Sequence, residues 1–421
     1  MALLSAFGLW FSHKSRFRQI TRLPAIVRGC VKELKKSEKG SHSAAASMAT
    51  ALGGTVGIGS ITGVGIALET GGAGSVFWMW ITGLLGCMLK YAETAAAVAG
   101  RDCSASPPCG GAMYALRAAG KSRAAAFFAV TCVAASFGTG CLTQSGAIAD
   151  AAAETGVDAR LTGAIAAACV LAAIWGGRRA MVRAAEFAVP AAGLIYLLAV
   201  SAVIIAGAGE LPRVFGEIFG SAFGIRQAAG GISGAAFTAA VRTGVTRGVF
   251  SSECGMGSSP IAHASNPSSK PGTQGDWGIL EVYADIFVFS TLTALAMLCC
   301  GTCSAYEVFA RLPFGIGGII FTPLLAVFGC AAAVSWCFYS ETCLEFLFHS
   351  AKAPKVLYRL CAAACVYLGA VADTRAVWNA ADILNLLMAL PNLYLLFIYR
   401  KEICLCFTRV SRPQKTAFRP G

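Results

Sequence analysis

Several stretches of about 20 residues in this chain carry almost no charge, and they constrain the fold more than any other feature. The clearest are residues 184–207, 279–298 and 316–338. A helix of about 20 apolar residues spans the hydrocarbon core of a bilayer. Only 13% of the 421 residues are charged, whereas a typical soluble domain carries about 25%. The sequence therefore predicts an all-α polytopic membrane protein.

About ten transmembrane helices are predicted, each bounded to within a few residues. They cover residues 45–68, 73–99, 124–152, 160–177, 184–208, 226–248, 275–301, 315–347, 357–372 and 376–398. Residues 1–44 form a basic N-terminal segment with a short apolar start, and residues 399–421 form a basic tail. A cleavable signal peptide is not expected, because the apolar run 1–11 has no basic region before it and no small-residue cleavage site after it.

Every second loop between the predicted helices is basic. Cytoplasmic loops of membrane proteins carry an excess of Lys and Arg, so this alternation predicts an even number of spans with both termini in the cytoplasm. We expect the plasma (inner) membrane of a bacterium-like cell. The net charge of +13 is spread over six loops, which disfavours a nucleic-acid-binding protein because such proteins gather their charge in one patch.

Glycines are dense in the first predicted helix. Residues 53–65 read GGTVGIGSITGVG and hold six glycines. Each interior Gly costs about 1 kcal/mol relative to Ala, so we expect this helix to break at 53–59. The sixth helix carries its own cluster, Gly230, Gly231 and Gly234. Paired interruptions in corresponding helices indicate a transporter built from inverted repeats, here residues 45–208 and 209–398 with five helices each.

A helix broken within the membrane leaves backbone groups unpaired, which is tolerated only where they line a cavity or bind a ligand. N–H groups that begin a half-helix attract a carboxylate, and freed C=O groups coordinate a cation. Close packing of small residues is the alternative, but the density of glycines favours a site. A dinucleotide-binding loop is excluded, because Gly57, Gly59 and Gly63 miss its spacing and no βαβ unit surrounds them.

Several longer motifs resemble those of the alanine/glycine:cation symporters, sodium-coupled amino-acid transporters with the LeuT-type 5+5 fold. The matching segments are GIGSITGVGIALETGGAGSVFWMW from Gly57, KYAE from Lys90, TQSGAIAD from Thr143, TRGVFSSECGMGSSPIAHAS from Thr246, SWCFYSETCLEFLF from Ser335 and LMALPNL from Leu387. The resemblance runs nearly end to end. It implies an inverted repeat with helices 1 and 6 interrupted, and secondary active transport of alanine or glycine by cation symport.

The resemblance also implies roles for individual residues. The amino acid would contact Thr55, Gly57, Gly59, Ser60, Gln144, Phe237 and Trp336. The cation would lie between backbone carbonyls near Gly53 and Val56 and the eighth helix at Ala331 and Ala332. For Phe237 and Trp336, packing against lipid or in the protein core is an equally favoured alternative to a role in the site. A site role is favoured for Gln144, because an amide in mid-membrane needs polar partners.

Several positions depart from the family pattern. Ser60 replaces an Asn, and Ala331 and Ala332 replace a Ser/Thr pair of the cation site. Gly146 and Ser252 also stand where the family has Asn. Methyl groups cannot coordinate sodium, which requires oxygen ligands. The sequence therefore leaves open a sodium-independent carrier of the same fold, proton-coupled or uniport, a passive channel, and a non-transporting relative or sensor.

Three acidic residues, Glu69, Glu253 and Glu341, have two interpretations each. Glu69, near the outer end of the first helix, is a possible proton site, although a solvated position at the helix boundary is favoured. Glu253, near Arg247, and Glu341 either close an inner gate through ion pairs or are simply solvated. No catalytic or zinc-binding motif occurs in the sequence, so an enzyme is not expected. The expected partners are an amino acid, the coupling ion (Na⁺, or H⁺ as the alternative) and the lipid bilayer, without cofactor or obligatory protein partner.

Overall fold

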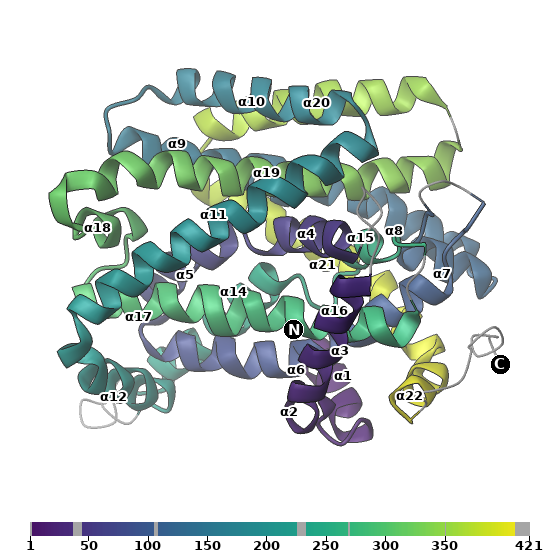
Figure 1. Ribbon diagram of the computed structural model, residues 1–421, viewed down its shortest axis with the longest axis horizontal. Helices are drawn as coiled ribbons and strands as arrows, with labels where there is room; N and C mark the ends of the chain where they lie inside the picture. Colours follow the sequence, from purple (N-terminus) through teal and green to yellow (C-terminus); the bar gives the residue numbers. More distant parts are fainter. Residues whose placement is uncertain are drawn as a thin grey trace.

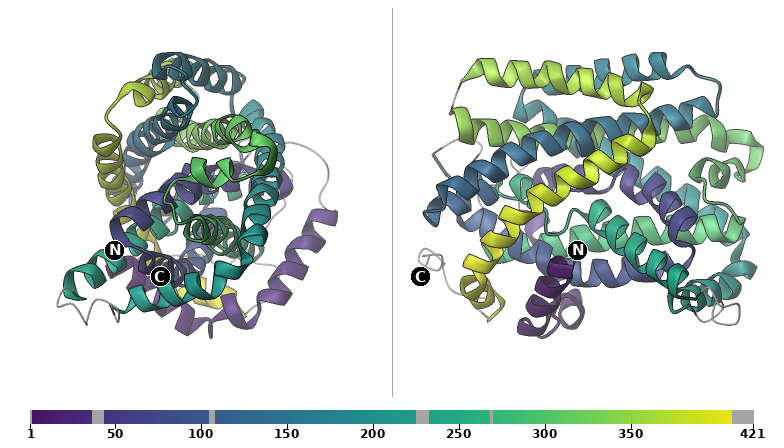
Figure 2. Two further views of the ribbon diagram at one scale, coloured as in Figure 1. Left: turned by 90° about the vertical axis from the view of Figure 1, so that its left-hand side faces the viewer. Right: turned by 180° about the vertical axis from the view of Figure 1, so that it is seen from behind.

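The structure is a computed structural model that describes residues 2–36, 44–104, 108–224, 233–267, 270–349 and 351–408. Within this part of the chain every named element is a helix. The long helices run along the longest axis of the molecule (Figure 1). The view from one end shows most of them end-on, and the view from behind shows α21 crossing the others obliquely (Figure 2). The prediction of an all-α chain is confirmed.

Eight helical segments of the described chain are long and apolar enough to cross a membrane. They are Ala45–Gly71, Gly74–Ala99, Ser122–Ala153, Arg178–Ala206, Pro271–Cys300, Ile316–Phe348, Lys352–Val371 and Ala376–Ile398. Each corresponds to a predicted span. Two shorter or more polar helices, α10 (Ala159–Trp175) and α14 (Ser233–Ser252), stand where the other two spans were predicted. The polytopic architecture is therefore confirmed.

The first half of the chain begins with three helices that precede the first span: α1 (Ala2–Lys14), α2 (Arg18–Thr21) and α3 (Leu23–Lys36). The spans that follow are α4 (Ala44–Thr55) with α5 (Ile58–Gly71), α6 (Gly74–Ala99), α8 (Ser122–Ala135) with η1 (Ser136–Leu142) and α9 (Thr143–Ala153), α10, and α11 (Arg178–Ala206). The short helix α7 (Ala112–Ala118) precedes α8.

The second half opens with a short amphipathic helix, α12 (Leu211–Ala222), before α14. The later elements are α15 (Pro260–His263), α16 (Pro271–Val282) with η3 (Tyr283–Ser290) and α17 (Thr291–Cys300), α18 (Ala305–Ala310), α19 (Ile316–Phe348), α20 (Lys352–Val371), α21 (Thr374–Ile398) and α22 (Arg400–Thr408). Both η1 and η3 are π-helical segments within longer helices.

Two spans begin earlier than the sequence predicts. α11 begins at Arg178 rather than at residue 184, and α20 begins at Lys352 rather than at 357. The sequence prediction placed the start of each helix after a group of basic residues. Arg and Lys extend their charged heads to the membrane surface while their stems lie along the helix, so a span need not end at its last apolar residue.

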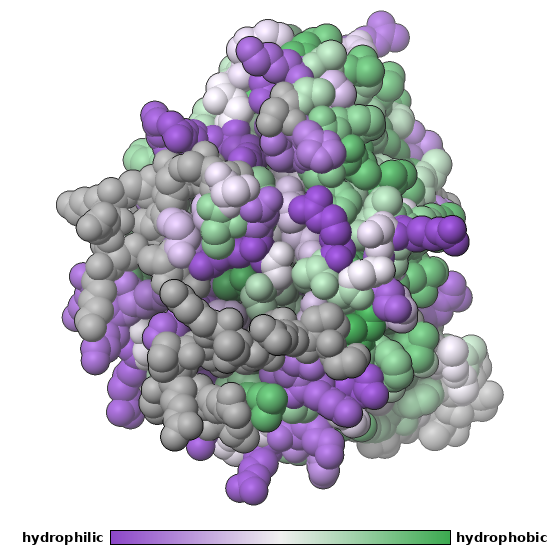
Figure 3. Space-filling view, turned by 90° about the vertical axis from the view of Figure 1, so that its right-hand side faces the viewer, coloured by the Kyte–Doolittle hydropathy of each residue, from purple (hydrophilic) through white to green (hydrophobic). Residues whose placement is uncertain are grey.

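The connections that carry many of the basic residues lie at one end of the bundle. α7 with the start of α8, and the connection from α19 to α20, lie at the right-hand end in Figure 1. Seen face-on, hydrophilic residues gather at this end while hydrophobic residues continue along one flank (Figure 3). The alternation seen in the sequence is thus reflected in the fold, and a cytoplasmic location of this end stays a prediction.

Close helix packing in the bundle depends on glycine. α14 packs along α6, and Gly244 of α14 lies directly against its backbone. An ideal Cβ at Gly244 would lie 2.4 Å from the carbonyl oxygen of Ser75 and 2.6 Å from Cβ of Trp78. No side chain can occupy this position unless the two helices separate.

We therefore expect Gly244→Ala to lower the melting temperature of the detergent-purified protein, because overpacking of this kind costs about 1–3 kcal/mol. Gly216→Ala in α12 is the matched control, since nothing lies within 4 Å of an ideal Cβ there. Thermal unfolding followed by intrinsic fluorescence compares the two variants. Equal melting temperatures would show that α6 and α14 do not pack this closely.

Candidate functional site

The first span is divided into two helices. α4 ends at Thr55, α5 begins at Ile58, and Val56 and Gly57 join them. The N–H of Gly57 donates to the carbonyl of Thr55 at 3.0 Å instead of continuing the helical pattern. Residues 53–60 are all buried. The predicted break is confirmed, and it lies in the interior of the protein.

Gln144 lies beside this break. An ideal Cβ at Gly57 would be 3.4 Å from Oε1 of Gln144 and 3.3 Å from Cβ of Ala332. Nε2 of Gln144 donates to the carbonyl of Thr139 at 3.0 Å, whereas its buried Oε1 has no hydrogen-bond partner. Gln144 lies two residues after the π-helical segment η1, and such segments are common at functional sites. The structure thus holds a free amide oxygen next to the break.

α19 covers the other side of the break. Ala331 and Ala332 are buried there, and an ideal Cβ at Gly53 would lie 3.7 Å from the carbonyl oxygen of Ala331. The same Cβ would be 2.7 Å from Oγ of Ser335, a buried hydroxyl without a hydrogen-bond partner. The first and eighth spans therefore meet as predicted. The sequence analysis missed Ser335, one turn further along α19, although it stands next to Trp336 in the SWCF motif.

The two predicted aromatic residues differ in position. Trp336 is fully buried, and Gly140 of η1 lies against it, since an ideal Cβ at Gly140 would be 2.4 Å from Cβ of Trp336. Phe237 is 38% exposed and packs against Trp78 at the rim of the bundle, with ring centroids 6.0 Å apart. The structure does not bring Phe237 to the break. Phe250, later in α14, is near the break instead, and its Cδ1 lies 3.5 Å from an ideal Cβ at Gly59.

The predicted interruption of the sixth span stays a prediction. Gly230 and Gly231 lie outside the described residues, and α14 runs unbroken from Ser233 through Gly234 to Ser252. The chain leaves the helix afterwards, with positive φ at Glu253, Gly255 and Gly257. Glycines that adopt positive φ end helices, whereas a glycine inside a packed helix is tolerated.

A buried carboxylate, Asp285 in η3, faces the beginning of α5. Ser60 Oγ and Ser251 Oγ both donate to its Oδ1, the latter at 2.8 Å. The two hydroxyl oxygens are 3.3 Å apart. All three residues are buried, and Oδ2 of Asp285 has no hydrogen-bond partner. The sequence analysis gave Asp285 no role, although an ionisable residue in the middle of a predicted span is a signal for a functional site.

A second group of buried charges joins α6 to α15 and α16. Lys90 Nζ donates to Ser259 Oγ at 2.7 Å and lies 3.4 Å from Glu281 Oε1 and 3.6 Å from Glu93 Oε1. Nε2 of His263 lies 2.9 Å from the other oxygen of Glu281. All these side chains are buried. We name this group the Lys90 network. It explains the charged positions of the KYAE motif as packing contacts between helices.

The predicted ion pair between Glu253 and Arg247 is not formed. Arg247 lies 3.4 Å from Asp382 of α21, and its guanidinium stacks on Trp378 at 4.7 Å. Glu253 is buried and accepts from Ser258 Oγ at 2.6 Å. The sequence predicted the pair because both residues lie near the end of the sixth span, but Arg247 faces α21 whereas Glu253 contacts Ser258 in the connection to α15. Their role in gating stays a prediction.

Glu341 does form an ion pair, but with α20. Arg359 Nε donates to Glu341 Oε1 at 2.5 Å and an Arg359 guanidinium N–H donates to the carbonyl of Trp175 at 3.0 Å. Glu69 is exposed in the last turn of α5, about 18 Å along that helix from Gly57. Its position agrees with a solvated carboxylate at the helix boundary rather than with a group in the site.

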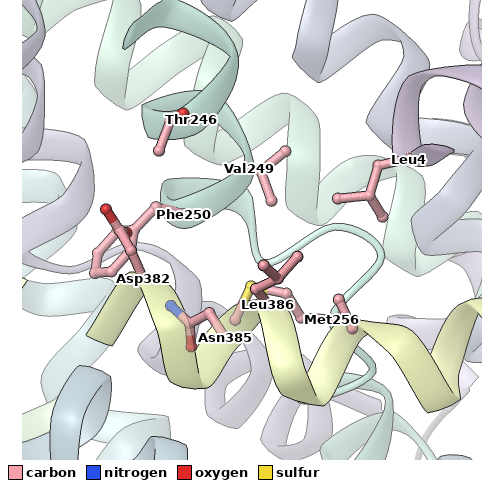
Figure 4. A pocket seen from close by; sticks show the side chains of 9 residues that line it. Leu4, Thr246, Val249, Phe250, Met256, Asp382, Asn385 and Leu386 are labelled. Atoms are coloured by element: carbon pink, nitrogen blue, oxygen red, sulfur yellow. The ribbon is translucent and has the colours of Figure 1, made fainter. Parts of the chain in front are cut away.

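Two pockets adjoin the site. The first lies between α14 and α21, where Asp382 and Asn385 face Val249 and Phe250 (Figure 4). Its volume of about 30 Å³ suits water rather than an amino acid. The second pocket, of about 130 Å³, is more polar and is lined by Thr62, Ala147, Asp150, Ala151, Glu154, Cys303, Ser304, Ala305, Tyr306, Phe321 and Leu325. We call it the acidic vestibule. It begins one helical turn from Ser60 and Gln144.

Removal of the cation from the Lys90 network should be strongly destabilising. We expect Lys90→Met to lower stability by about 3–5 kcal/mol, because two carboxylates would stay buried without a countercharge. The melting temperature of purified protein measures this. A second change, Glu281→Gln, should restore part of the loss by removing one stranded charge.

Arg213→Ala serves as the control for this prediction. Arg213 pairs with Glu210 and Glu217 on the surface of α12, and exposed pairs of this kind contribute about 0–1 kcal/mol. If Lys90→Met were as mild as Arg213→Ala, the Lys90 network would not be the buried ion-pair group that the structure describes.

Comparison with known proteins agrees with this architecture. The model of the sodium:alanine symporter family matches residues 1–417. The sodium/alanine symporter AgcS of Methanococcus maripaludis is 34% identical over 417 residues, which cover 93% of this chain and 90% of that protein. The probable sodium/glutamine symporter GlnT of Bacillus subtilis is 32% identical over 440 residues, covering 100% and 89%.

A third relative differs in the ions that its name gives. The sodium/proton-dependent alanine carrier protein of Bacillus sp. strain PS3 is 28% identical over 405 residues, which cover 87% of each chain. These proteins are transporters rather than enzymes, in line with the multi-pass helical fold described above. The chain therefore belongs to the sodium:alanine symporter family.

Proposed function

We propose that this protein is a secondary active transporter that moves a small neutral amino acid, alanine or glycine first, together with a cation by alternating access. The observation that carries this proposal is the buried break at Val56–Gly57, which faces the unpartnered Oε1 of Gln144. A lipid-spanning helix is interrupted inside a protein only where the freed groups serve a cavity or a ligand.

The chemistry of the break suits a zwitterion. The N–H groups that begin α5, at Ile58 and Gly59, lack partners within the helix and attract a carboxylate. Oε1 of Gln144 accepts from an ammonium group on the other side. The hydroxyl of Thr55 donates to the carbonyl of Ala51 at 3.2 Å, so we expect Thr55 to contribute through its backbone.

The size of the space favours the smallest amino acids. A methyl group on Gly57 would already lie 3.3 Å from Cβ of Ala332. Trp336 is fully buried and packs against Gly140 of η1, the segment that precedes Gln144. A substrate with a hydrogen or a methyl side chain fits such a wall at lower cost than a longer one.

The arrangement of the spans supports an inverted repeat. Residues 45–208 contain the divided helix α4–α5 and four further spans, and residues 209–398 contain α14 and four further spans. The chain also leaves helical geometry at 253–257, between α14 and α15. A discontinuity in the leading helix of each half is the arrangement expected of a LeuT-type 5+5 transporter.

The acidic vestibule gives the site a route for a cation. Asp150 and Glu154 line it, and a cleft lined by charges of one sign raises the local concentration of the opposite ion. We place this end outside and both termini in the cytoplasm, in the plasma (inner) membrane. Sodium is the first candidate, as in the names of the relatives, and a proton or uncoupled transport is favoured only by the methyl groups at Ala331 and Ala332.

Uptake of labelled alanine into proteoliposomes tests the proposal. We expect an inward sodium gradient to drive accumulation above the external concentration, because the downhill movement of the cation supplies the free energy. Uptake driven only by a proton gradient, or by neither ion, would identify the sodium-independent alternatives. Absence of saturation and counterflow would indicate a channel, and alanine binding without uptake would indicate a sensor.

Gln144→Ala should raise the alanine concentration for half-maximal uptake by about tenfold or more, since it removes a hydrogen bond to a charged group. Ser145→Ala is the control, because Ser145 Oγ donates to carbonyls of its own helix, at Cys141 and Leu142. Initial uptake rates over a range of alanine concentrations give both values. An unchanged value for Gln144→Ala would remove Gln144 from the substrate site.

A further inference from the structure

We propose that a groove between α1 and the end of α21 binds one anionic phospholipid, with an acyl chain in the groove and the headgroup phosphate on Arg400. The proposal goes beyond the proposed function, because it concerns a specific lipid rather than the substrate or the coupling ion. It does not depend on which amino acid or ion the protein transports.

The groove has the size and the lining of a site for an amphiphile. Its volume is about 320 Å³, and ligand sites of this size are mainly apolar with a few polar groups. The view from behind shows the end of α21 close to the N-terminal helices (Figure 2). The residues that line the groove are Leu3, Ala6, Phe7, Trp10, Phe397 and Arg400. Five of them are apolar, and Arg400 supplies the charge.

α1 is too short to cross the membrane, and it has two different faces. Its 13 residues extend about 20 Å, less than the 30 Å of the hydrocarbon core. On one face Leu4 and Gly8 are buried, and an ideal Cβ at Gly8 would lie 2.8 Å from the carbonyl oxygen of Leu85 in α6. The groove face differs, because Leu3 is 61% exposed and Trp10 is 37% exposed.

Along α1 the groove face passes from apolar to basic residues. Leu3, Phe7 and Trp10 follow one another at spacings of four and three residues, which places them on one side of the helix. Lys14, four residues after Trp10, continues this side and is exposed. Trp favours the boundary between hydrocarbon and headgroups, and Lys extends its charge toward the membrane surface. This order, apolar and then basic, matches a phospholipid from its acyl chain to its headgroup.

The end of α21 repeats this order on the other side of the groove. Phe397 lies in the last turn of the candidate span that ends at Ile398, and Arg400 and Lys401 begin α22. The guanidinium of Arg400 stacks on the ring of Phe397 at 4.3 Å and donates to the Phe397 carbonyl at 2.6 Å. These contacts hold the charge of Arg400 beside the apolar lining, at the level where the last span ends.

The basic residues beside the groove lack carboxylate partners. Among the described residues, no ion pair involves Lys14, Arg400 or Lys401. Glu402 is the acidic neighbour in α22 and offsets only one of these three positive charges. Basic clusters directly cytoplasmic of a span, and basic pockets between spans, bind anionic headgroups. Charge complementarity therefore selects an anionic phospholipid over a zwitterionic one.

Binding of the lipid should stabilise the fold, because α1 also contacts the centre of the bundle. Leu4 leaves no room for a side chain at Gly255, in the connection that follows α14. It also lines the pocket between α14 and α21 (Figure 4). A lipid that holds α1 in place strengthens these contacts as well. A ligand of the folded state raises stability, so binding is measurable as a change in melting temperature.

The test uses the purified full-length protein in detergent, titrated with phosphatidylglycerol or with phosphatidylcholine of the same acyl chains. Arg400→Gln removes the headgroup contact, whereas Arg400→Lys keeps its charge. Lys352→Gln is the matched control, because Lys352 is an exposed cation at the start of α20 and does not line the groove. The melting temperature is measured for each variant, and native mass spectrometry counts the lipid molecules that stay bound.

A second pair of variants tests the place of the acyl chain. Ala6→Trp fills the groove, and Ala168→Trp puts the same side chain at an exposed position of α10. Light scattering gives the oligomeric state of both variants, so a groove that is covered by a second copy of the chain is detected.

We expect phosphatidylglycerol to raise the melting temperature of the native protein more than phosphatidylcholine does, with one retained molecule. Arg400→Gln should raise the half-effective phosphatidylglycerol concentration about fivefold, the effect of one cation near an anionic membrane surface. Arg400→Lys and Lys352→Gln should match the native protein. Ala6→Trp should lose the retained lipid and Ala168→Trp should keep it. If Ala6→Trp does not fold, the Arg400 variants decide the proposal.

Equal responses to the two lipids would overturn the proposal, as would a native phosphatidylglycerol response in Arg400→Gln. Retention of the lipid by folded Ala6→Trp would place the lipid outside the groove and overturn it as well. A dimer that dissociates in Ala6→Trp, without a response to phosphatidylglycerol, would assign the groove to a second copy of the chain. These measurements need no transport of alanine, so this proposal and the proposed function can fail independently.

Discussion

The structure depends on one constraint, that a polypeptide in hydrocarbon must satisfy its backbone hydrogen bonds within the protein. The break at Val56–Gly57 leaves backbone groups without partners in their own helix, so other helices must shield these groups from lipid. α4 packs against α11 and α19, and α5 packs against α14. Glycine makes this enclosure close, because Gly53 faces Ser335 and Gly59 faces Ser251 at distances that leave no room for a side chain without displacement. The surrounding helices therefore provide the packing that the broken first span needs within the membrane.

Buried charges follow the same requirement, and they divide into two kinds. In the Lys90 network each charged group has a partner of opposite charge or a hydroxyl within reach. Asp285 has only hydroxyl donors and keeps one oxygen free. A network in which every charge is paired stabilises the contact between helices, whereas a buried polar atom without a partner is costly. The Lys90 network and Asp285 are equally buried. They differ in whether the charged groups have partners of opposite charge.

The sequence predicted what depends on local composition. Charge-free stretches located the spans, and glycine density located the break in the first of them. It failed where the answer depends on which face of a helix meets its neighbours: Phe237 was predicted in the site, but the phase of α14 places Phe250 there. Ser60, Ser251 and Asp285 are separated by up to 225 residues, and only the packing of α5, α14 and η3 brings them together.

The departures from the family pattern become coherent when both sides of the break are considered. Ala331 and Ala332 offer no side-chain oxygens on the α19 side, where the hydroxyls of Ser335 and Tyr339 face the end of α4. On the other side, Ser60, where the resemblance implies an Asn, donates to the carboxylate of Asp285. A charged oxygen binds a cation more strongly than a neutral one. The absence of side-chain oxygens at positions 331 and 332 is therefore accompanied by a buried carboxylate beside the start of α5.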